Sequence, residues 1–267
     1  MKRYVWLTDL HLNFPGNEPT GKFLDRIGSL GTDGVFLGGD ISEWPDGPNY
    51  LRMMAERLVQ PIYFVLGNHD YYFSSIDTVR RYMERLCDEA PRLVWLPRAE
   101  PIELAPGVGL IGHDGWADGR YGDYWRSLVM LNDYRLITEL APLDKVTRLS
   151  KLHQLGDEAA AHVRRALPTA LSRFKHVVCL THVPPFREAC WYEGRISDDE
   201  WLPHFTCKAV GDALREIMTA HPQHEMTVLC GHTHGAGEAE ILPNLHVFTG
   251  GAQYGAPEIQ RVFEWDG

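Results

Sequence analysis

Aspartate and histidine side chains recur in this sequence directly after short apolar runs. Five such runs lead, in chain order, into the segments Asp9-Leu10-His11, Gly38-Gly39-Asp40, Gly67-Asn68-His69-Asp70, Thr181-His182 and Gly231-His232-Thr233-His234. Imidazole and carboxylate groups without a thiolate are the ligands of Mn, Fe, Zn or Co in catalytic sites, rather than those of a structural zinc cage. The residue types therefore predict metal-assisted chemistry.

The size of the ligand set predicts more than one metal ion. The candidate ligands are Asp9, His11, Asp40, Asn68, His182, His232 and His234. They exceed one tetrahedral shell and suit two metals about 3.5–4 Å apart that share a carboxylate. Each motif alone is weak, because a single Asp-x-His or Gly-Gly-Asp also occurs at ordinary strand-to-loop turns. The prediction depends on the ordered set.

The apolar runs before these motifs are short and rich in β-branched and aromatic residues, as is typical of buried strands. We expect strands at residues 4–7, 35–37, 62–66, 93–96, 102–104, 108–111, 177–180, 227–229, 245–248 and 259–263. Helical spacing of apolar residues is found at 50–59, 76–87 and 208–219. Strands that alternate with helices predict an α/β fold, and hairpin-like strands near the C-terminus predict mixed sheets. Because ligands bind beyond the carboxyl ends of strands in such sheets, the five loops are expected to meet in one crevice.

Two segments depart from this alternation. Residues 115–175 contain no clear strand, so we interpret them as a helical, lid-like insertion in a single domain that spans residues 1–267. Residues 184–205 are irregular and rich in aromatic side chains. Each segment either covers the site or is ordinary packing. Candidates for gripping the substrate are Arg120, Tyr121, Arg135 and Arg187, although a surface arginine is usually only a solvated charge. Tyr71 and Tyr72 either line the pocket or belong to the core. His113 and Asp114 either reach the site or cap a strand, and the cap is favoured.

Charge and hydropathy narrow the range of partners. Among 267 residues there are 26 Lys and Arg against 36 Asp and Glu, a formal net charge of −10. An acidic surface repels a phosphate backbone, which argues against nucleic acid as a partner. No run approaches the roughly 20 apolar residues of a membrane span, and the N-terminus has no secretion signal. We interpret the protein as cytoplasmic.

The five motifs, in this order, resemble those of the calcineurin-like metallophosphoesterase superfamily, and they extend from Asp9 to His234. The resemblance implies a four-layer α/β/β/α sandwich of two mixed sheets with a helical insertion. It also implies two divalent or trivalent transition-metal ions at the strand ends. The implied reaction is hydrolysis of a phosphate mono- or diester by in-line attack of a metal-bridging hydroxide. The implied substrate is a small phosphorylated molecule.

Roles for individual residues follow from the resemblance. One metal is assigned to Asp9, His11 and His234, the other to Asn68, His182 and His232, and both to Asp40. His69 is expected near the leaving group, as an acid or as a stabiliser of charge. Asp70 is interpreted either as the partner that orients His69 or as a plain turn residue.

Three interpretations of function remain open at this point. The first is a phosphoesterase, acting on monoesters or on diesters, since the metal-binding motifs are common to both. The second is a metal-loaded but inactive binding module that presents its insertion to a partner. The third is a nuclease of the same superfamily, which the net charge of −10 disfavours.

Overall fold

Two β-sheets form the centre of the computed structural model, which describes residues 1–266. The first sheet has the strand order β13 (Arg261–Trp265), β1 (Lys2–Leu7), β2 (Gly34–Gly38), β3 (Ile62–Val65) and β4 (Leu93–Trp95). The second has the order β11 (Gly237–Leu242), β12 (Leu245–Thr249), β10 (Glu225–Cys230), β7 (His176–Thr181), β6 (Val108–His113) and β5 (Ile102–Ala105). Edge strands β13, β11 and β5 pair antiparallel, and the other pairs within both sheets are parallel. The prediction of mixed sheets is confirmed.

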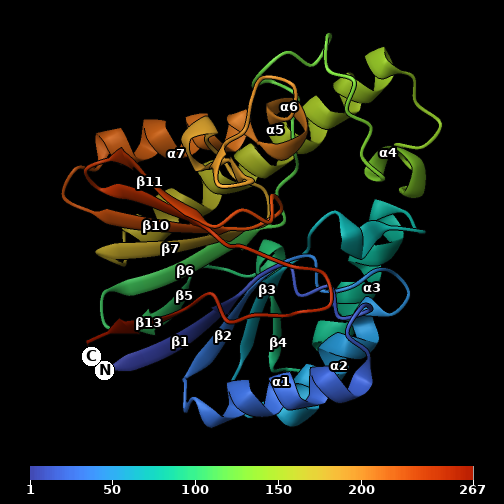
Figure 1. Ribbon diagram of the computed structural model, residues 1–267. Helices are drawn as coiled ribbons and strands as arrows, with labels where there is room; N and C mark the ends of the chain where they lie inside the picture. The colour runs from blue at the N-terminus through green and yellow to red at the C-terminus, as the bar shows by residue number, and fades with distance from the viewer. Residues whose placement is uncertain (267) are drawn as a thin grey trace.

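Helices cover the outer face of each sheet. The first sheet carries α1 (Asn17–Ser29), α2 (Gly47–Arg57) and α3 (Ile76–Glu89), and the second carries α5 (Lys145–Leu171) and α7 (Lys208–Ala220) (Figure 1). The side chains of β1 alternate accordingly. Val5 and Leu7 pack in the core under the helices, while Tyr4 and Trp6 pack in the core between the sheets. The four-layer α/β/β/α sandwich is therefore confirmed.

Local sequence explains where the well-predicted helices begin and which face they bury. The hydroxyl of Ser75 accepts a hydrogen bond from the Thr78 amide at 3.1 Å and so caps α3. Ile76, Val79, Met83 and Leu86 then form one buried stripe along this helix. The same capping arrangement starts α5, where the Asp144 carboxylate accepts from the Thr147 amide at 2.8 Å.

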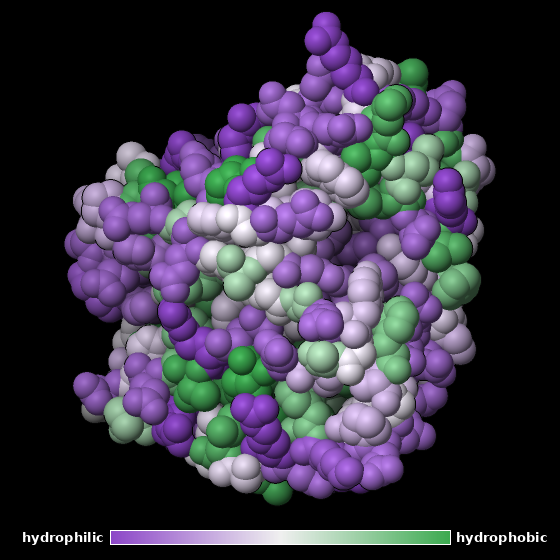
Figure 2. All heavy atoms as spheres, in the orientation of Figure 1, coloured by the Kyte–Doolittle hydropathy of each residue, from purple (hydrophilic) through white to green (hydrophobic). Residues whose placement is uncertain are grey.

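Short elements fill the connections at the carboxyl ends of the strands. They are η1 (His69–Tyr71), η2 (Leu96–Arg98), α4 (Asp133–Leu136), η3 (Arg187–Ala189), β8 (Trp191–Tyr192), β9 (Arg195–Ile196) and α6 (Leu202–Phe205). Within the segment 115–175, α5 packs on the second sheet through Ala159, Val163 and Leu167. The stretch before α5 is mostly irregular and exposes large hydrophobic side chains, namely Trp125, Leu128 and Met130. Figure 2 shows a hydrophobic group at the upper right of a largely hydrophilic face. A lid function for this stretch stays a prediction.

Among residues 1–266, no helix combines the length and the apolar character that crossing a bilayer requires.

Candidate metal centre

All seven predicted ligands lie together at the carboxyl ends of β1, β2, β3, β7 and β10. One group is formed by Asp9, His11, Asp40 and His234, whose ligand atoms all lie within 4.8 Å of one another. Nε2 of His11 is 3.0 Å from Nε2 of His234 and 3.7 Å from Oδ2 of Asp40. Two imidazoles and two carboxylates directed at one point are the donor set of a transition-metal ion.

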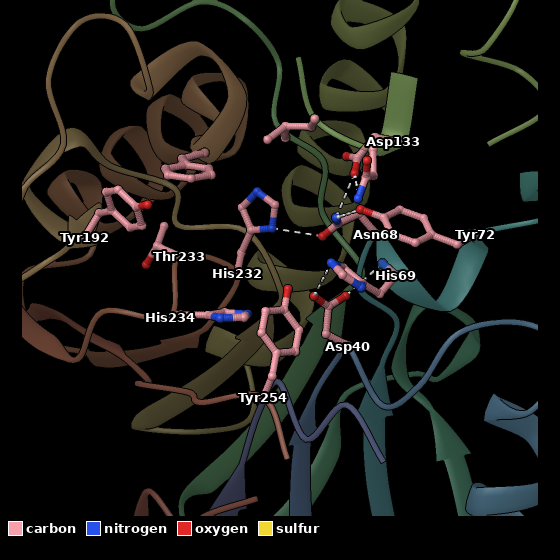
Figure 3. Close-up of a pocket in the computed structure, with 13 residues that line it drawn as sticks. Asp40, Asn68, His69, Tyr72, Asp133, Tyr192, His232, Thr233, His234 and Tyr254 are labelled. Carbon is pink, nitrogen blue, oxygen red and sulfur yellow. Dashed lines mark hydrogen bonds and ion pairs between the residues drawn. The ribbon is translucent and has the colours of Figure 1, made fainter. Parts of the chain in front are cut away.

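A second group lies beside the first and shares Asp40 with it. Oδ1 of Asn68 is 2.9 Å from Nδ1 of His232 (Figure 3) and 3.1 Å from Nε2 of His182. The same His182 nitrogen is 3.4 Å from Oδ1 of Asp40. The two oxygens of Asp40 therefore face the two groups separately, as a carboxylate shared between two metals requires.

Hydrogen bonds outside the cluster fix which atom each ligand presents. Nδ1 of His182 donates to the Gly38 carbonyl at 2.8 Å, and Nε2 of His232 donates to the His204 carbonyl at 3.0 Å. Each ring therefore turns its other nitrogen towards Asn68, and this is the nitrogen that a metal ion would bind.

The amide of Asn68 is oriented in the same way. Its nitrogen donates to Oδ1 of Asp133 at 2.8 Å and to the hydroxyl of Tyr72 at 3.2 Å. Since both donor contacts lie on one side of the amide, the carbonyl oxygen is directed at the two histidines. The donor atoms, their convergence and their orientation fit a pair of transition-metal ions.

Five of the ligand residues have left-handed backbone conformations. The φ angles are 51° at Asp9, 43° at His11, 49° at Asp40, 71° at His232 and 58° at His234. Such angles are uncommon outside glycine and cost about 1–3 kcal/mol each when the surroundings hold them in place. The strained turns let each strand end abruptly with its side chain directed into the cluster, which is typical of a functional site.

Glycines are required where the loops approach one another. A Cβ atom at Gly67 would lie 2.1 Å from Oδ1 of Asp40, and one at Gly231 would lie 1.9 Å from Oδ2 of Asp9 and 2.2 Å from Oγ1 of Thr8. The latter two oxygens are themselves joined by a 2.5 Å hydrogen bond. A side chain at either glycine would displace a candidate ligand.

Replacing Gly231 with alanine is therefore expected to reduce bound metal to less than about half of the wild-type content, because the new methyl group displaces the Asp9 carboxylate. Metal analysis of the purified protein measures this effect. The matched control is Gly28→Ala, whose added Cβ would meet only Leu58 Cδ2 at 3.8 Å. Full metal content in the Gly231 variant would contradict the ligand role of Asp9.

Charges inside the cluster are strongly coupled. Burial alone would raise the pKa of the Asp40 carboxyl, but the surrounding imidazoles, His182 first, hold it well below its ordinary value. Burial alone would likewise lower the pKa of His182, but Asp40 raises it to about 10. Burial lowers the pKa of His11 and of His232 to about 3, so these two rings are neutral. His182 thus carries the proton that a metal ion must displace.

Metal affinity is consequently expected to rise with pH between about 6 and 9. Below its pKa of about 10, His182 holds a proton in the metal-free protein, and the proton competes with the metal by up to about tenfold per pH unit. The competition would end above the pKa. Titrations against a chelating indicator at several pH values measure the trend, and calorimetry in two buffers of different ionisation enthalpy counts the protons released. Affinity independent of pH would contradict the protonation of His182.

The position of His69 differs from that of the ligands. Its side chain is 14% exposed, and Nε2 lies 3.9 Å from Oδ2 of Asp40. Its ring lies 4.3 Å from the Tyr72 ring, between centroids, and 4.6 Å from the His11 ring. His69 thus borders the cavity above the metal centre, where a substrate would enter (Figure 3).

The interpretation of Asp70 as the partner of His69 needs a correction. Its carboxylate accepts from the backbone amides of Ile41 at 3.1 Å, Ser42 at 3.2 Å and Gly67 at 2.8 Å. These bonds tie together the loops after β2 and β3. The carboxylate that faces His69 Nδ1, at 3.9 Å, is that of Glu43. Sequence reasoning missed Glu43 because no short motif joins it to His69.

The two carboxylates should respond differently to substitution. Asp70→Asn is expected to lower the free energy of unfolding by about 2 kcal/mol, since an NH2 group replaces one of the two oxygens that accept hydrogen bonds from buried backbone amides. Glu43→Gln is expected to leave stability within about 0.5 kcal/mol and to lower turnover by about tenfold, as loss of a histidine partner does. Denaturant unfolding and steady-state kinetics separate the two effects. A reversed pattern would restore the pairing of Asp70 with His69.

A cavity of about 280 Å³ opens over the metal centre. Besides the site residues Asp40, Asn68, His69, His232 and His234, its lining comprises Tyr72, Leu131, Asn132, Asp133, Tyr192, Phe205, Thr233 and Tyr254. None of the four proposed substrate-contacting residues from the insertion and the following loop is in this lining. Arg120 is held by Asp118 and Asp157, and Arg187 by Asp199.

Of the other residues singled out from the sequence, some line the cavity wall and others lie in the protein core. Tyr72 is a wall residue, whereas Tyr71 is fully buried in the core under the first sheet. Asp114 accepts from the Leu66 amide at 2.8 Å and from the Tyr71 hydroxyl at 2.8 Å, so it serves the strand end as expected of a cap. Tyr254 and Asp133 were not predicted, and they lie in stretches without a motif.

Comparison with known proteins agrees with this geometry. The family model described as calcineurin-like phosphoesterase matches residues 2–236. A comparison with curated protein sequences finds no match. Among solved structures, the phosphopantetheinyl hydrolase of Mycobacterium tuberculosis is similar with a TM-score of 0.66 at 16% identity, over 95% of this chain and 90% of that one. A dimetal phosphatase from Danio rerio is similar with a TM-score of 0.58 at 12% identity, over 94% of this chain and 87% of that one.

At these identities the solved structures support the fold, whereas the family model identifies the chain. The model covers most of the 267 residues and includes all five motifs. The activity is metal-dependent hydrolysis of phosphate esters, in agreement with the buried cluster of aspartate and histidine ligands. The protein belongs to the calcineurin-like phosphoesterase family.

Proposed function

We propose that this protein is a dinuclear phosphoesterase that cleaves a small phosphorylated substrate by in-line attack. The observation that carries the proposal is the position of Asp40, whose two oxygens face separate groups of candidate ligands at 3.4 Å and 3.7 Å. One metal would be held by Asp9, His11 and His234 and the other by Asn68, His182 and His232, with Asp40 between them. Mn, Fe, Zn and Co all suit these nitrogen and oxygen ligands.

The metals, when bound, lower the pKa of a coordinated water and neutralise charge on the phosphoryl oxygens. The protein's own contribution is to hold the ligands rigidly. His182 and His232 are fixed by backbone carbonyls, and Asn68 is fixed by Asp133 and Tyr72. Fixed donors stabilise the transition state without reorganising during the reaction.

His69 is proposed to act on the leaving group. Its ring borders the cavity and is packed between Tyr72 and His11, so its orientation is restricted. Glu43 faces its Nδ1, which leaves Nε2 directed towards Asp40 and the reacting phosphate. In this position His69 can donate a proton to the departing oxygen or stabilise its charge.

The segment 115–175 is proposed to close one side of the active site. Leu131, Asn132 and Asp133 from its irregular part line the cavity, while α5 packs on the second sheet.

The decisive experiment measures metals and turnover together. Purified protein is stripped with a chelator, reconstituted with Mn²⁺, Zn²⁺, Co²⁺ or Fe²⁺, and assayed with p-nitrophenyl phosphate and bis(p-nitrophenyl) phosphate. We expect no turnover of either ester without metal, and recovery only as the content approaches two ions per chain. Full activity with one ion per chain, or after stripping, would overturn the dinuclear proposal.

A further inference from the structure

The walls of the cavity beside the metal centre are acidic and aromatic. Asp133, a residue of α4, is 4% exposed and lines the cavity. Its Oδ1 accepts from Asn68 at 2.8 Å and from the Tyr72 hydroxyl at 2.8 Å. No hydrogen bond of a described residue uses its other oxygen, Oδ2. Oδ2 of this carboxylate in the cavity wall is therefore available to pair with a bound molecule.

This carboxylate is one side chain away from the proposed metal site. The amide of Asn68 lies between them: its nitrogen donates to Asp133, and its oxygen is close to His232 (Figure 3) and to His182. A phosphoryl group bound at the metals would thus place the first atoms of its alcohol within reach of Asp133. A substituent two or three bonds from the ester oxygen is the part of the substrate that this carboxylate can select.

Aromatic rings form much of the remaining wall. Tyr192 and Phe205 lie 5.4 Å apart between ring centroids, with their rings at 62° to each other. In Figure 3, Tyr192 lies on the side of the cavity opposite Asp133 and Tyr72, and Tyr254 lies below them. Electron-rich ring faces around an acidic group attract organic cations, and they repel anions.

The charged residues that line the cavity further restrict the class of substrate. The residues that line the cavity include neither lysine nor arginine, although these are the side chains that bind distal phosphates and carboxylates. The net charge of −10 favours approach of a cation over that of a second anionic group. The volume of about 280 Å³ is also at the lower end of the range for small-molecule sites.

We propose that the cavity selects phosphate esters whose alcohol carries an alkylammonium group close to the ester oxygen. The inference rests on the proposed function, because the phosphoryl group must be held at the metal centre. Asp133 would pair with the ammonium group, and Tyr72, Tyr192 and Tyr254 would supply ring faces around it. Nucleoside polyphosphates and esters with distal carboxylates would be poor substrates.

The test uses a matched pair of substrates that differ only in charge. Phosphocholine and 3,3-dimethylbutyl phosphate have the same shape, since a quaternary carbon replaces nitrogen in the second. The methyl diesters of both provide the same comparison for diester hydrolysis. With metal-reconstituted wild-type protein, we expect kcat/KM to favour the ammonium ester by about tenfold. p-Nitrophenyl phosphate is assayed in parallel as a measure of the chemistry itself.

Three variants test which residues cause the preference for the ammonium ester. Asp133→Asn keeps an oxygen acceptor for Asn68 and Tyr72 but removes the charge, so the ratio of kcat/KM for the two esters, measured on the same protein, should fall below about threefold. Tyr192→Leu removes an aromatic ring from the cavity wall and should lower the ratio by about threefold. The matched control is Asp25→Asn, an exposed carboxylate paired with Arg57, which should leave the ratio unchanged.

Binding measurements test the ammonium site without relying on turnover. Calorimetric titration of the metal-loaded protein with phosphocholine and with its neutral analogue should show the same preference. Preferential binding without turnover of any ester would overturn the proposed function but leave the ammonium site standing. Turnover of the aryl ester with equal or better use of the neutral analogue would overturn the ammonium site alone.

Discussion

Replacement of Asp40 with alanine is expected to remove both metal ions and to lower kcat/KM for phosphate esters by about a thousandfold or more. A bound metal contributes several kcal/mol to transition-state stabilisation, and each 1.36 kcal/mol corresponds to about a factor of ten in rate. Asp40 is 1% exposed, and its two oxygens lie 3.4 Å from His182 and 3.7 Å from His11.

The measurement is metal content per chain, determined together with the kinetics on protein shown to be folded by circular dichroism. Asp25→Ala, which removes an exposed carboxylate paired with Arg57, controls for the loss of charge. Retention of one full equivalent of metal in the Asp40 variant would assign this carboxylate to a single metal. The shared-ligand arrangement would then be wrong.

Replacement of His69 with asparagine should have the opposite signature. The backbone amide of residue 69, which donates to Oδ1 of Asp40 at 2.9 Å, is preserved in the variant. Metal content should therefore stay at the wild-type level, while turnover falls by about 10²–10⁴, the usual contribution of a general acid. Equal loss of metal and of activity would instead make His69 a ligand.

Comparing two phosphate esters distinguishes the two possible roles of His69. As a proton donor it matters most for a poor leaving group, so the loss in the variant should be larger for an alkyl phosphate than for p-nitrophenyl phosphate. As a stabiliser of charge on the phosphoryl oxygens it would affect both esters about equally. The ratio of the two losses separates these roles.

Most sheet strands and the candidate ligands could be predicted because both depend on short patterns of neighbouring residues in the sequence. A buried strand needs a short run of apolar residues, and each ligand motif follows its strand directly, as at Asp9 and Asp40. In parallel strands of one sheet these ends meet at the same edge. Short local motifs were therefore enough to predict that ligands far apart in the chain lie close together in the fold.

Helix α1 and strand β11 are two of the elements that escaped prediction, and each did so for a physical reason. Helix α1 contains Pro19, Gly21 and Gly28 and has no side-chain cap, so its local propensity is low; burial of Phe23 and other side chains stabilises it. Strand β11 is exposed along much of its length, with Glu238 and Glu240 on its outer side. Its short, charged alternation does not resemble a buried strand.

The partners of buried polar groups could not be predicted either. Asp70 is adjacent to His69 in sequence, yet its carboxylate points to the amides of another loop, and Glu43 occupies the place expected of it. Asp133 similarly reaches Asn68 from 65 residues away. Such contacts depend on side-chain directions in the folded protein, and no residue spacing encodes them.

The pairing of β13 with β1 has a consequence for how the protein is made. Lys2 lies opposite Trp265 in this ladder, and the two ends of the chain are neighbours (Figure 1). A nascent chain emerging from the ribosome therefore cannot complete its first sheet until residue 265 has left the exit tunnel. Such long-range pairing slows folding and leaves the β1 edge exposed during synthesis.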